Sequence, residues 1–162
     1  MTDLLDRLLK DAEIGLGTPD SPRLIVEIWL AVPSAAGRRV LMLKRSQRRG
    51  GFWQGVSGRV ERTDRNLREA AQREIGEELG LRSGVELQDL GHWYDFTSPF
   101  SGTTFRKRSM AALLPAAATP EGITLSEEHV EARLVTFAEA RRLVRWEENV
   151  EELTGLEDAL GR

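Results

Sequence analysis

The stretch Arg73-Glu74-Ile75-Gly76-Glu77-Glu78-Leu79-Gly80-Leu81 is the part of this sequence that decides its fold. In a helix, Glu74, Glu77 and Glu78 stand at positions i, i+3 and i+4 and project from one face. They fall near the C-terminal end, where the helix dipole is negative and acidic side chains are unfavourable. Because carboxylate oxygens are the ligands that Mg²⁺ and Mn²⁺ prefer, the pattern predicts a helix face that binds a divalent cation.

A helix from Leu67 to Leu79 is predicted around this stretch. Asn66 and Glu69 have the spacing of a capping box at its start, and Gly80 supplies the left-handed residue that ends it. Apolar residues at helical spacing predict its buried side: Leu67, Ala70, Ala71, Ile75 and Leu79. Arg73 lies among the acids as an internal counter-ion, but one positive charge cannot balance three carboxylates.

A solvated acidic face is the commoner explanation of a glutamate-rich helix. Against it stands the glycine-rich segment Gly50-Gly51-Phe52-Trp53-Gln54-Gly55-Val56-Ser57-Gly58, since a purely solvated helix needs no tight loop before it. Together, loop and helix resemble the signature of the Nudix hydrolases. The helical half matches at every position from Arg73 to Leu81, whereas the loop half has one additional residue between Gly58 and Arg73.

The resemblance implies roles for the residues of this motif. In the family an acidic loop residue orients the arginine of the helix; Asp64 is predicted to do so for Arg73, and Glu61 is a rival candidate. The backbone carbonyl of Gly58 would join the three helical glutamates as a ligand of Mg²⁺, for which Mn²⁺ could substitute. Gly80 is a structural residue of the same motif.

The implied chemistry is hydrolysis of a phosphoanhydride bond by a Nudix pyrophosphohydrolase. Mg²⁺ typically keeps several waters and adds substrate phosphates to its shell, so a diphosphate bridge is its natural ligand. Arg73 and Glu77 are predicted catalytic residues of the helix. In relatives the general base is a glutamate of the helix or an acid from a later loop. Glu128 is preferred here because Glu128-His129 precedes a predicted strand, although Glu127 and Glu128 could equally be solvated turn acids.

Scattered short matches resemble the branch of the family that hydrolyses dihydroneopterin triphosphate and dATP. They include residues 40–45, the glycine-rich loop, Glu128-His129, and Trp146 with Asn149. Arg45 is predicted to bind polyphosphate, and Trp146 and Asn149 the heterocycle; basic edges in solvent and ordinary packing are the competing explanations. The products would be a monophosphate and pyrophosphate. Dinucleoside polyphosphates and nucleotide sugars are alternative substrates, and a non-catalytic nucleotide-binding module is the alternative function.

The order of predicted elements favours an α/β (α+β) domain, and the resemblance implies the Nudix α/β/α sandwich with a mixed β-sheet. Predicted strands are 23–32, 39–45, 53–60, 85–96, 105–114 and 132–137, the first two forming a hairpin. Residues 138–146 and 148–160 are predicted to form one helix or two. Residues 23–162 would form the single domain, preceded by an amphipathic helix and linker at 1–22. That helix could pack on the domain or serve a homodimer.

Composition and charge limit the classes of protein. With 162 residues and 40% hydrophobic content, the chain can bury one core and leaves little room for a second domain. A net charge of −3 argues against general nucleic-acid binding. There is no cysteine and no run of about 18 apolar residues, so neither a thiolate metal site nor a membrane span is predicted. A cytoplasmic enzyme acting on a small nucleotide or pterin polyphosphate is predicted.

Overall fold

The sheet is built around β1 (Arg23–Ser34), in which every residue from Leu24 to Val32 is buried. In the computed structural model, which describes residues 3–162, β1 pairs with β2 (Gly37–Arg45) in antiparallel orientation. On its other side it pairs with β6 (Thr104–Leu113) in parallel orientation. A strand that is covered on both faces needs a nearly continuous apolar run, which is what this part of the sequence supplies.

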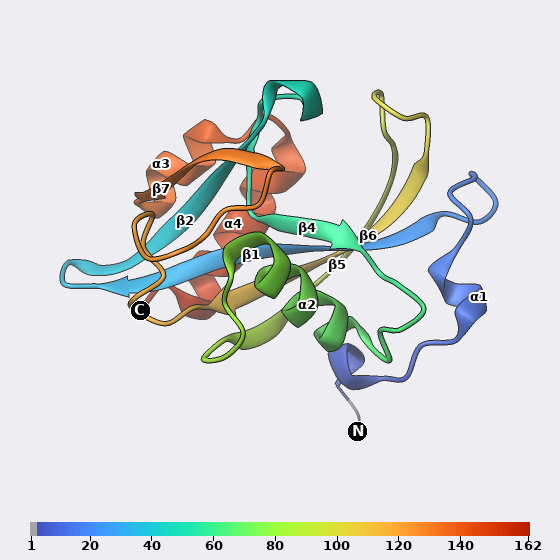
Figure 1. The fold of residues 1–162 in the computed structure, drawn as a ribbon, viewed down its shortest axis with the longest axis horizontal. Coiled ribbons are helices and arrows are strands. Elements are labelled where there is room, and N and C mark those ends of the chain that lie inside the picture. The colour runs from blue at the N-terminus through green and yellow to red at the C-terminus, as the bar shows by residue number, and fades with distance from the viewer. Residues whose placement is uncertain (1–2) are drawn as a thin grey trace.

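Across the described residues, seven strands form one mixed sheet (Figure 1). Its main path runs β3-β2-β1-β6-β5, while β4 pairs with β1 and β7 pairs with β2. The remaining strands are β3 (Trp53–Gln54), β4 (Val56–Arg59), β5 (Glu86–Thr97) and β7 (His129–Val135). The predicted hairpin of the first two strands is confirmed, with Ser34 opposite Gly37.

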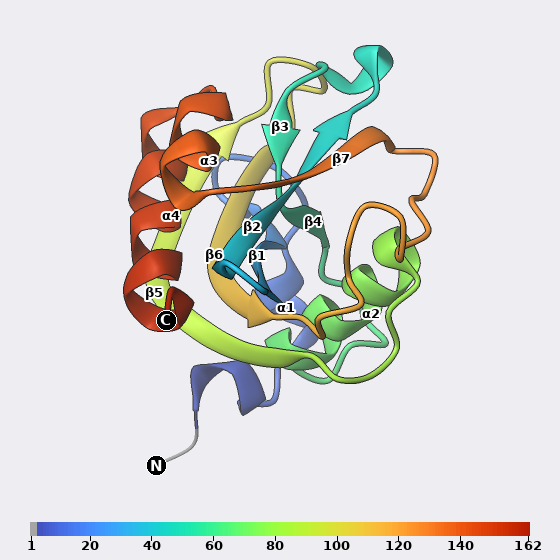
Figure 2. The same cartoon turned by 90° about the vertical axis from the view of Figure 1, so that its left-hand side faces the viewer.

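Helices cover both faces of the sheet (Figure 2). On one face α2 (Leu67–Leu79) shares a core with alternate residues of β1, including Ile28. On the other face α3 (Phe137–Leu143) and α4 (Glu147–Leu160) share a second core with residues such as Trp29. The predicted α/β/α sandwich is therefore confirmed. Across the described residues, none of the helices has the length and apolar character needed to cross a bilayer.

The segment before β1 differs from the single amphipathic helix predicted there. It contains two short helices, the 3-10 helix η1 (Leu4–Asp6) and α1 (Asp11–Ile14), and residues 1 and 2 lie outside the described range. Between them the backbone N–H of Leu9 donates a 2.9 Å hydrogen bond to the carbonyl oxygen of Arg65. Leu5 and Ile14 belong to the same core as α2. Tertiary contacts therefore shape this segment more than helix propensity does.

Two strand boundaries also differ from prediction. The predicted strand 53–60 is divided at Gly55 into β3 and β4, which pair with β2 and β1 respectively. A Cβ atom on Gly55 would lie 2.0 Å from the carbonyl oxygen of Ile28, so the crossing requires glycine. The predicted strand 132–137 begins earlier, at His129, because this residue pairs with Arg45 of β2. The earlier start places His129 inside the fold.

Candidate active site

The helix that carries the glutamates begins and ends where the sequence predicts. α2 spans Leu67–Leu79, and the side chain of Asn66 accepts a 2.9 Å hydrogen bond from the backbone N–H of Glu69. Gly80 adopts a left-handed conformation with φ of 74° and ends the helix. Ile75 is fully buried in the core, and of the three glutamates Glu74 and Glu78 are also buried, whereas Glu77 is exposed.

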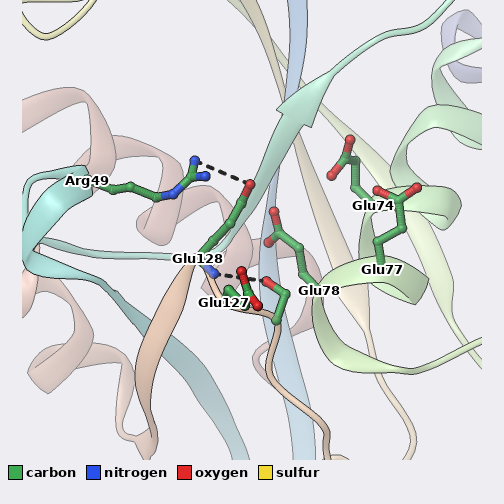
Figure 3. Close-up of a pocket in the computed structure, with 7 residues that line it drawn as sticks. Arg49, Glu74, Glu77, Glu78, Glu127 and Glu128 are labelled. Carbon is green, nitrogen blue, oxygen red and sulfur yellow. Dashed lines mark hydrogen bonds and ion pairs between the residues drawn. The ribbon is translucent and has the colours of Figure 1, made fainter.

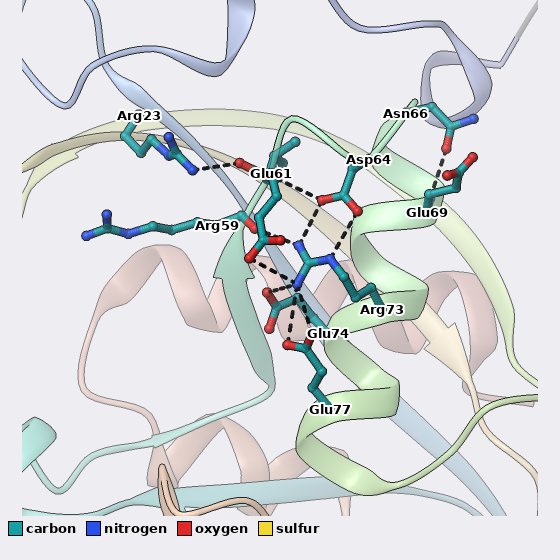
Figure 4. Close-up of polar contacts among 10 residues, drawn as sticks. Arg23, Arg59, Glu61, Asp64, Asn66, Glu69, Arg73, Glu74 and Glu77 are labelled. Carbon is teal, nitrogen blue, oxygen red and sulfur yellow. Dashed lines mark hydrogen bonds and ion pairs between the residues drawn. The ribbon is translucent and has the colours of Figure 1, made fainter. Parts of the chain in front are cut away.

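Arg73 is the centre of a polar network at the N-terminal side of the acidic face (Figure 4). Its Nε and Nη2 atoms donate to the two carboxylate oxygens of Asp64 at 3.0 and 2.8 Å, and Nη2 also donates to the carbonyl oxygen of Arg59. Asp64 is only 6% exposed and accepts a further hydrogen bond from the backbone N–H of Glu61. The Glu61 carboxylate lies farther away, 3.8 Å from Nη1 of Arg73. Of the two rival acids, Asp64 makes the bidentate contact.

The third nitrogen of the guanidinium holds carboxylates of the helix itself. Nη1 of Arg73 donates to Oε1 of Glu74 at 2.9 Å and lies 3.4 Å from both oxygens of Glu77. Hydrogen bonding to Asp64 raises the pKa of Arg73 above its usual range. Burial raises the pKa of Glu74 to about 7, although Arg73 acts in the opposite direction.

Gly58 on β4 lies directly against this part of the helix. A Cβ atom at position 58 would lie 2.0 Å from Cδ of Glu74, so any side chain would displace that carboxylate. The missing side chain lets the strand backbone and the helix carboxylate approach each other. The structure thus brings the backbone of Gly58 beside Glu74, as its predicted role of carbonyl ligand requires.

Glu78 lies one turn along from Glu74, and its surroundings are different. The residue is 3% exposed, and neither of its carboxylate oxygens has a hydrogen-bond partner among the described residues. Burial, followed by the neighbouring acid Glu128, raises the pKa of Glu78 to about 10. Because an isolated buried charge is very unfavourable, this carboxylate needs either a proton or a bound cation.

A pocket joins the acidic helix to the loop before β7 (Figure 3). Acidic side chains from the two segments face one another across it, and the loop acid Glu128 forms a 3.4 Å ion pair with Arg49. The residues that line the pocket are Arg49, Glu74, Glu77, Glu78, Ser126, Glu127 and Glu128. The structure therefore places the three predicted helical ligands and the predicted base around one space.

The donor chemistry of this pocket suits a hard divalent cation. Within residues 3–162, no three acidic, histidine or cysteine side chains converge into a complete ligand set. The oxygens of Glu78 are nonetheless buried and unpaired, and the backbone of Gly58 lies beside Glu74. Carboxylate and carbonyl oxygens are the ligands of Mg²⁺, which typically fills the rest of its shell with water and substrate phosphates. The kinds of donor atom present therefore fit the implied metal.

Arg45, the predicted phosphate ligand, ends β2 beside the pocket. Its Nε atom is buried and has no hydrogen-bond partner among the described residues, and its guanidinium carbon lies 5.2 Å from the ring centroid of Phe52. Burial lowers the pKa of Arg45, whereas the charges of Glu128 and Glu78 act to raise it. The side chain thus has an unused donor close to the acidic residues.

The two predicted ligands of the heterocycle lie in different surroundings. Trp146 is 36% exposed and packs edge-on against Phe52, with 4.7 Å between ring centroids. Asn149 is buried, and its amide donates to Glu152 at 3.0 Å and to Glu27 at 3.4 Å. Trp146 keeps a free surface, whereas the Asn149 amide is occupied within a buried polar cluster.

Two groups of polar residues were missed by sequence reasoning. Nζ of Lys107 lies 3.4 Å from Glu27 and 3.1 Å from Glu152 in the buried cluster. Glu27, a charged residue within an apolar strand, was the feature of the sequence that could have indicated this buried cluster. The second group is Gln54 and His129, whose Nε2 atoms are 3.1 Å apart. No sequence signal joins these two residues, because strand pairing alone brings them together.

A family profile described as the NUDIX domain matches residues 25–154. The chain belongs to the Nudix hydrolase family. Among solved Nudix proteins of similar fold, one described as a NUDIX hydrolase from Listeria monocytogenes has a TM-score of 0.67 and 25% identity, covering 83% of this chain and 92% of that chain. The family, fold and enzyme class predicted from the sequence are thereby confirmed.

Two further Nudix structures share the fold at lower identity. The Ap4A hydrolase of C. elegans has a TM-score of 0.71 at 17% identity, covering 84% of this chain and 96% of that chain. The dihydroneopterin triphosphate pyrophosphohydrolase of E. coli has a TM-score of 0.66 at 21% identity, with 85% and 94% covered. A curated relative, the octanoyltransferase of Myxococcus xanthus, is 40% identical over 79 residues. That match spans 48% of this chain and only 21% of the relative.

Proposed function

We propose that this Nudix protein is a Mg²⁺-dependent hydrolase that converts a nucleoside triphosphate or dihydroneopterin triphosphate to the monophosphate and pyrophosphate. The observation that carries the proposal is the buried, unpaired carboxylate of Glu78 at a pocket shared with Glu74 and Glu77. A carboxylate in that position is stabilised by a cation, and a cation in an open pocket attracts polyphosphate.

The helix supplies most of the proposed metal site. Glu74, Glu77 and Glu78 are the side-chain ligands, joined by the backbone carbonyl of Gly58. When bound, Mg²⁺ polarises phosphoryl oxygens and stabilises the leaving phosphate. Arg73 holds Glu74 and Glu77 through Nη1, and Asp64 fixes the guanidinium from the other side. Arg73 thus acts by positioning ligands.

Glu128 is the proposed general base. Its carboxylate lines the pocket on the side opposite α2, and its ion pair with Arg49 holds it there. A carboxylate across the pocket from the metal ligands can accept a proton from a water that attacks the bound phosphate. Glu77, the more exposed of the helical glutamates, is the alternative base because it reaches the same space.

The proposed substrate is a polyphosphate attached to a flat heterocycle. Support comes from relatives of the same fold that are named for acting on Ap4A and on dihydroneopterin triphosphate. Arg45, with its unused Nε donor, is the proposed phosphate contact, since guanidinium groups match phosphate oxygens. The exposed part of Trp146 is the proposed stacking surface. Asn149, whose backbone N–H donates to the carbonyl oxygen of Trp146, is proposed to hold Trp146 in position.

A product-release screen tests the proposal. Nucleoside triphosphates, dihydroneopterin triphosphate, dinucleoside polyphosphates and nucleotide sugars are incubated with the protein, with Mg²⁺, with Mn²⁺ and with a chelator. We expect metal-dependent release of pyrophosphate from a triphosphate. Cleavage restricted to dinucleoside polyphosphates or nucleotide sugars would replace the proposed substrate class. Inactivity of the folded protein on every substrate, with nucleotide binding retained, would favour a binding module.

A further inference from the structure

Buried polar atoms without partners gather at one place behind the pocket. Nδ1 of His129 and both carboxylate oxygens of Glu78 are buried and make no hydrogen bond within the described part of the chain. The His129 side chain is fully buried, and its Nδ1 lies 3.9 Å from Oε2 of Glu78. Buried polar groups are nearly always hydrogen-bonded, so two such groups facing each other call for an explanation.

The contact on the other side of the imidazole ring determines which nitrogen carries the proton. Nε2 of His129 lies 3.1 Å from Nε2 of Gln54. An amide nitrogen donates and does not accept, so the histidine nitrogen facing it must be the acceptor. In a neutral imidazole the proton then resides on Nδ1, the atom that faces Glu78. A doubly protonated ring would set two donors against each other at the Gln54 contact.

The backbone fixes the distance between the histidine and the glutamate. Gln54 lies opposite Leu43 in the β2–β3 pair, and His129 pairs with Arg45 at the end of β2. The backbone N–H of Ser126 donates to the carbonyl oxygen of Glu78, and that of His129 donates to the carbonyl oxygen of Ser126. The loop before β7 is thus tied to the C-terminal turn of α2, which keeps His129 and Glu78 next to each other.

We propose that Gln54 and His129 form a positioning relay for Glu78, in which the Gln54 amide holds the imidazole as its Nδ1–H tautomer and this N–H orients the carboxylate toward the pocket. The inference rests on the proposed metal-binding role of Glu78. The proposed site then includes residues of β3 and β7 as well as those of α2. Gln54 and His129 do not contact the metal; they act through Glu78.

A neutral donor is the suitable group for this position. Hydrogen bonds from outer-shell residues orient metal ligands and are worth about 10- to 100-fold in metal affinity. A cationic side chain in the same place would repel a divalent cation, whereas a neutral imidazole offers one directed N–H. Positive charge near Glu78 already comes from Arg45, and Arg49 is held by Glu128. His129 therefore contributes direction without adding charge.

The first test is independent of any metal. The chain has two histidines, His92 and His129, so His92→Gln leaves a single imidazole to observe. Nitrogen-15 NMR of the ring at neutral pH, in the metal-free protein, distinguishes the two neutral tautomers and the charged form. We expect the Nδ1–H tautomer. An Nε2–H tautomer or a charged ring would overturn the relay.

The second test uses binding of Mn²⁺, measured by electron paramagnetic resonance or calorimetry on the folded variants. His129→Asn places an amide near the Nδ1 position and retains a donor toward Glu78, whereas His129→Gln places its amide near the Nε2 position. We expect His129→Gln to bind Mn²⁺ about 10- to 100-fold more weakly than the wild type and His129→Asn to recover most of the affinity. Circular dichroism confirms that both variants are folded.

The outcomes separate the relay from the proposed function. Wild-type affinity in His129→Gln, or equal losses in the two variants, would overturn the relay while leaving the metal site intact. Failure of the wild type itself to bind Mn²⁺ would overturn the metal site, and the relay with it. Gln54→Leu completes the series: we expect it to weaken Mn²⁺ binding and to shift the His129 ring away from the pure Nδ1–H tautomer.

Discussion

The two ends of the acidic face solve the same electrostatic problem in different ways. Around Arg73, one guanidinium bridges Asp64, Glu74 and Glu77, so these carboxylates are paired within the protein itself. One turn further along the same helix, Glu78 is more deeply buried than Glu77 and has no hydrogen-bond partner among the described residues. The Arg73 end is complete as it stands, whereas the Glu78 end requires a ligand or a proton.

This difference indicates that one end of the helix has a structural role and the other a functional one. The Arg73 network resembles a structural ion-pair cluster, whose removal weakens the fold. The Glu78 carboxylate has the opposite effect, because its burial without a partner lowers the stability of the fold. Binding of a cation can restore that stability. Residues that lower stability but occupy a pocket are typical of functional sites. Substitutions at the two ends should therefore change stability in opposite directions.

The largest expected effect is that of Glu78→Gln on activity. Removing the buried charge removes a proposed metal ligand, so metal-dependent hydrolysis should fall by more than about 100-fold. Thermal unfolding of the metal-free variant at neutral pH should shift to higher temperature than in the wild type, because the amide is neutral in both states, whereas Glu78 must take up a proton when the chain folds. Initial-rate assays and calorimetry measure the two effects. Unchanged hydrolysis together with lower stability would place Glu78 among the structural residues.

At the other end, Asp64→Asn should destabilise the protein. It leaves Arg73 with one fewer ionic partner at a site where Asp64 is almost fully buried and Arg73 is 19% exposed. Breaking a fully buried pair costs about 3–5 kcal/mol, and the partial exposure of Arg73 reduces the expected loss to about 2 kcal/mol. Urea denaturation measures it. A loss of activity without any change in the unfolding midpoint would contradict the structural role given to this network.

The stability of the metal-free protein should depend on pH through Glu78. Its pKa is raised from 4.5 in the unfolded chain to about 10 in the fold, so the folded state retains a proton that the unfolded chain releases. The contribution of this group is therefore complete below about pH 4.5 and decreases as the pH rises toward 10. Urea unfolding curves recorded over about two pH units either side of neutral measure this change in the free energy of unfolding. In Glu78→Gln the free energy of unfolding should depend less steeply on pH. If the pH dependence is the same as in the wild type, other groups cause it.

Arg45→Ala should change substrate binding more than catalysis. Loss of the unused Nε donor and of the positive charge should raise the KM for a triphosphate by about 10-fold, with a smaller effect on kcat. Steady-state kinetics measure both constants, and Arg48→Ala, an exposed arginine of the same segment, is the matched control. If the two variants have the same KM, Arg45 is not a phosphate contact.

The smallest effect is expected for Glu69→Gln, on the same helix but outside both networks. Glu69 forms an exposed i, i+4 ion pair with Arg65, whose side chain is 78% exposed. Such pairs are worth about 0.3–0.5 kcal/mol, so stability should change by no more than that, and hydrolysis should be unaltered. The variant is thus the glutamate-to-glutamine control for Glu78→Gln. A large loss of activity here would show that the acidic helix responds as a whole to any change of charge.

Much of the acidic helix could be predicted because its signals are local. The Asn66 cap, the spacing of the three glutamates and the ending at Gly80 all act within a few residues, and the helix has the predicted limits. The paired strands at 23–34 and 37–45 were equally legible from their apolar runs and the intervening turn. Where neighbouring residues alone determine conformation, a single sequence is sufficient.

The N-terminal segment takes its conformation from contacts with distant residues. Leucine spacing predicted one amphipathic helix, but a hydrogen bond from Leu9 to Arg65 holds the chain extended between two short helices. Asn149 is a similar case, since the family resemblance predicted that it contacts the heterocycle together with Trp146. The helix α4 instead turns its amide toward Glu152 and Glu27. Both differences come from partners that are distant along the chain.

The sequence by itself determined the acidic helix and the identity of the acids around it, because spacing and capping are properties of neighbouring residues, and its resemblance to the Nudix signature implied the family and the sandwich fold. Only the tertiary structure decided which acids are paired and which are not. Asp64 reaches Arg73 through the particular path of its loop, and Glu78 meets His129 because β7 begins early enough to pair with Arg45. The reason is physical: burial and partnership depend on strand register and on packing between distant segments, which no local pattern specifies.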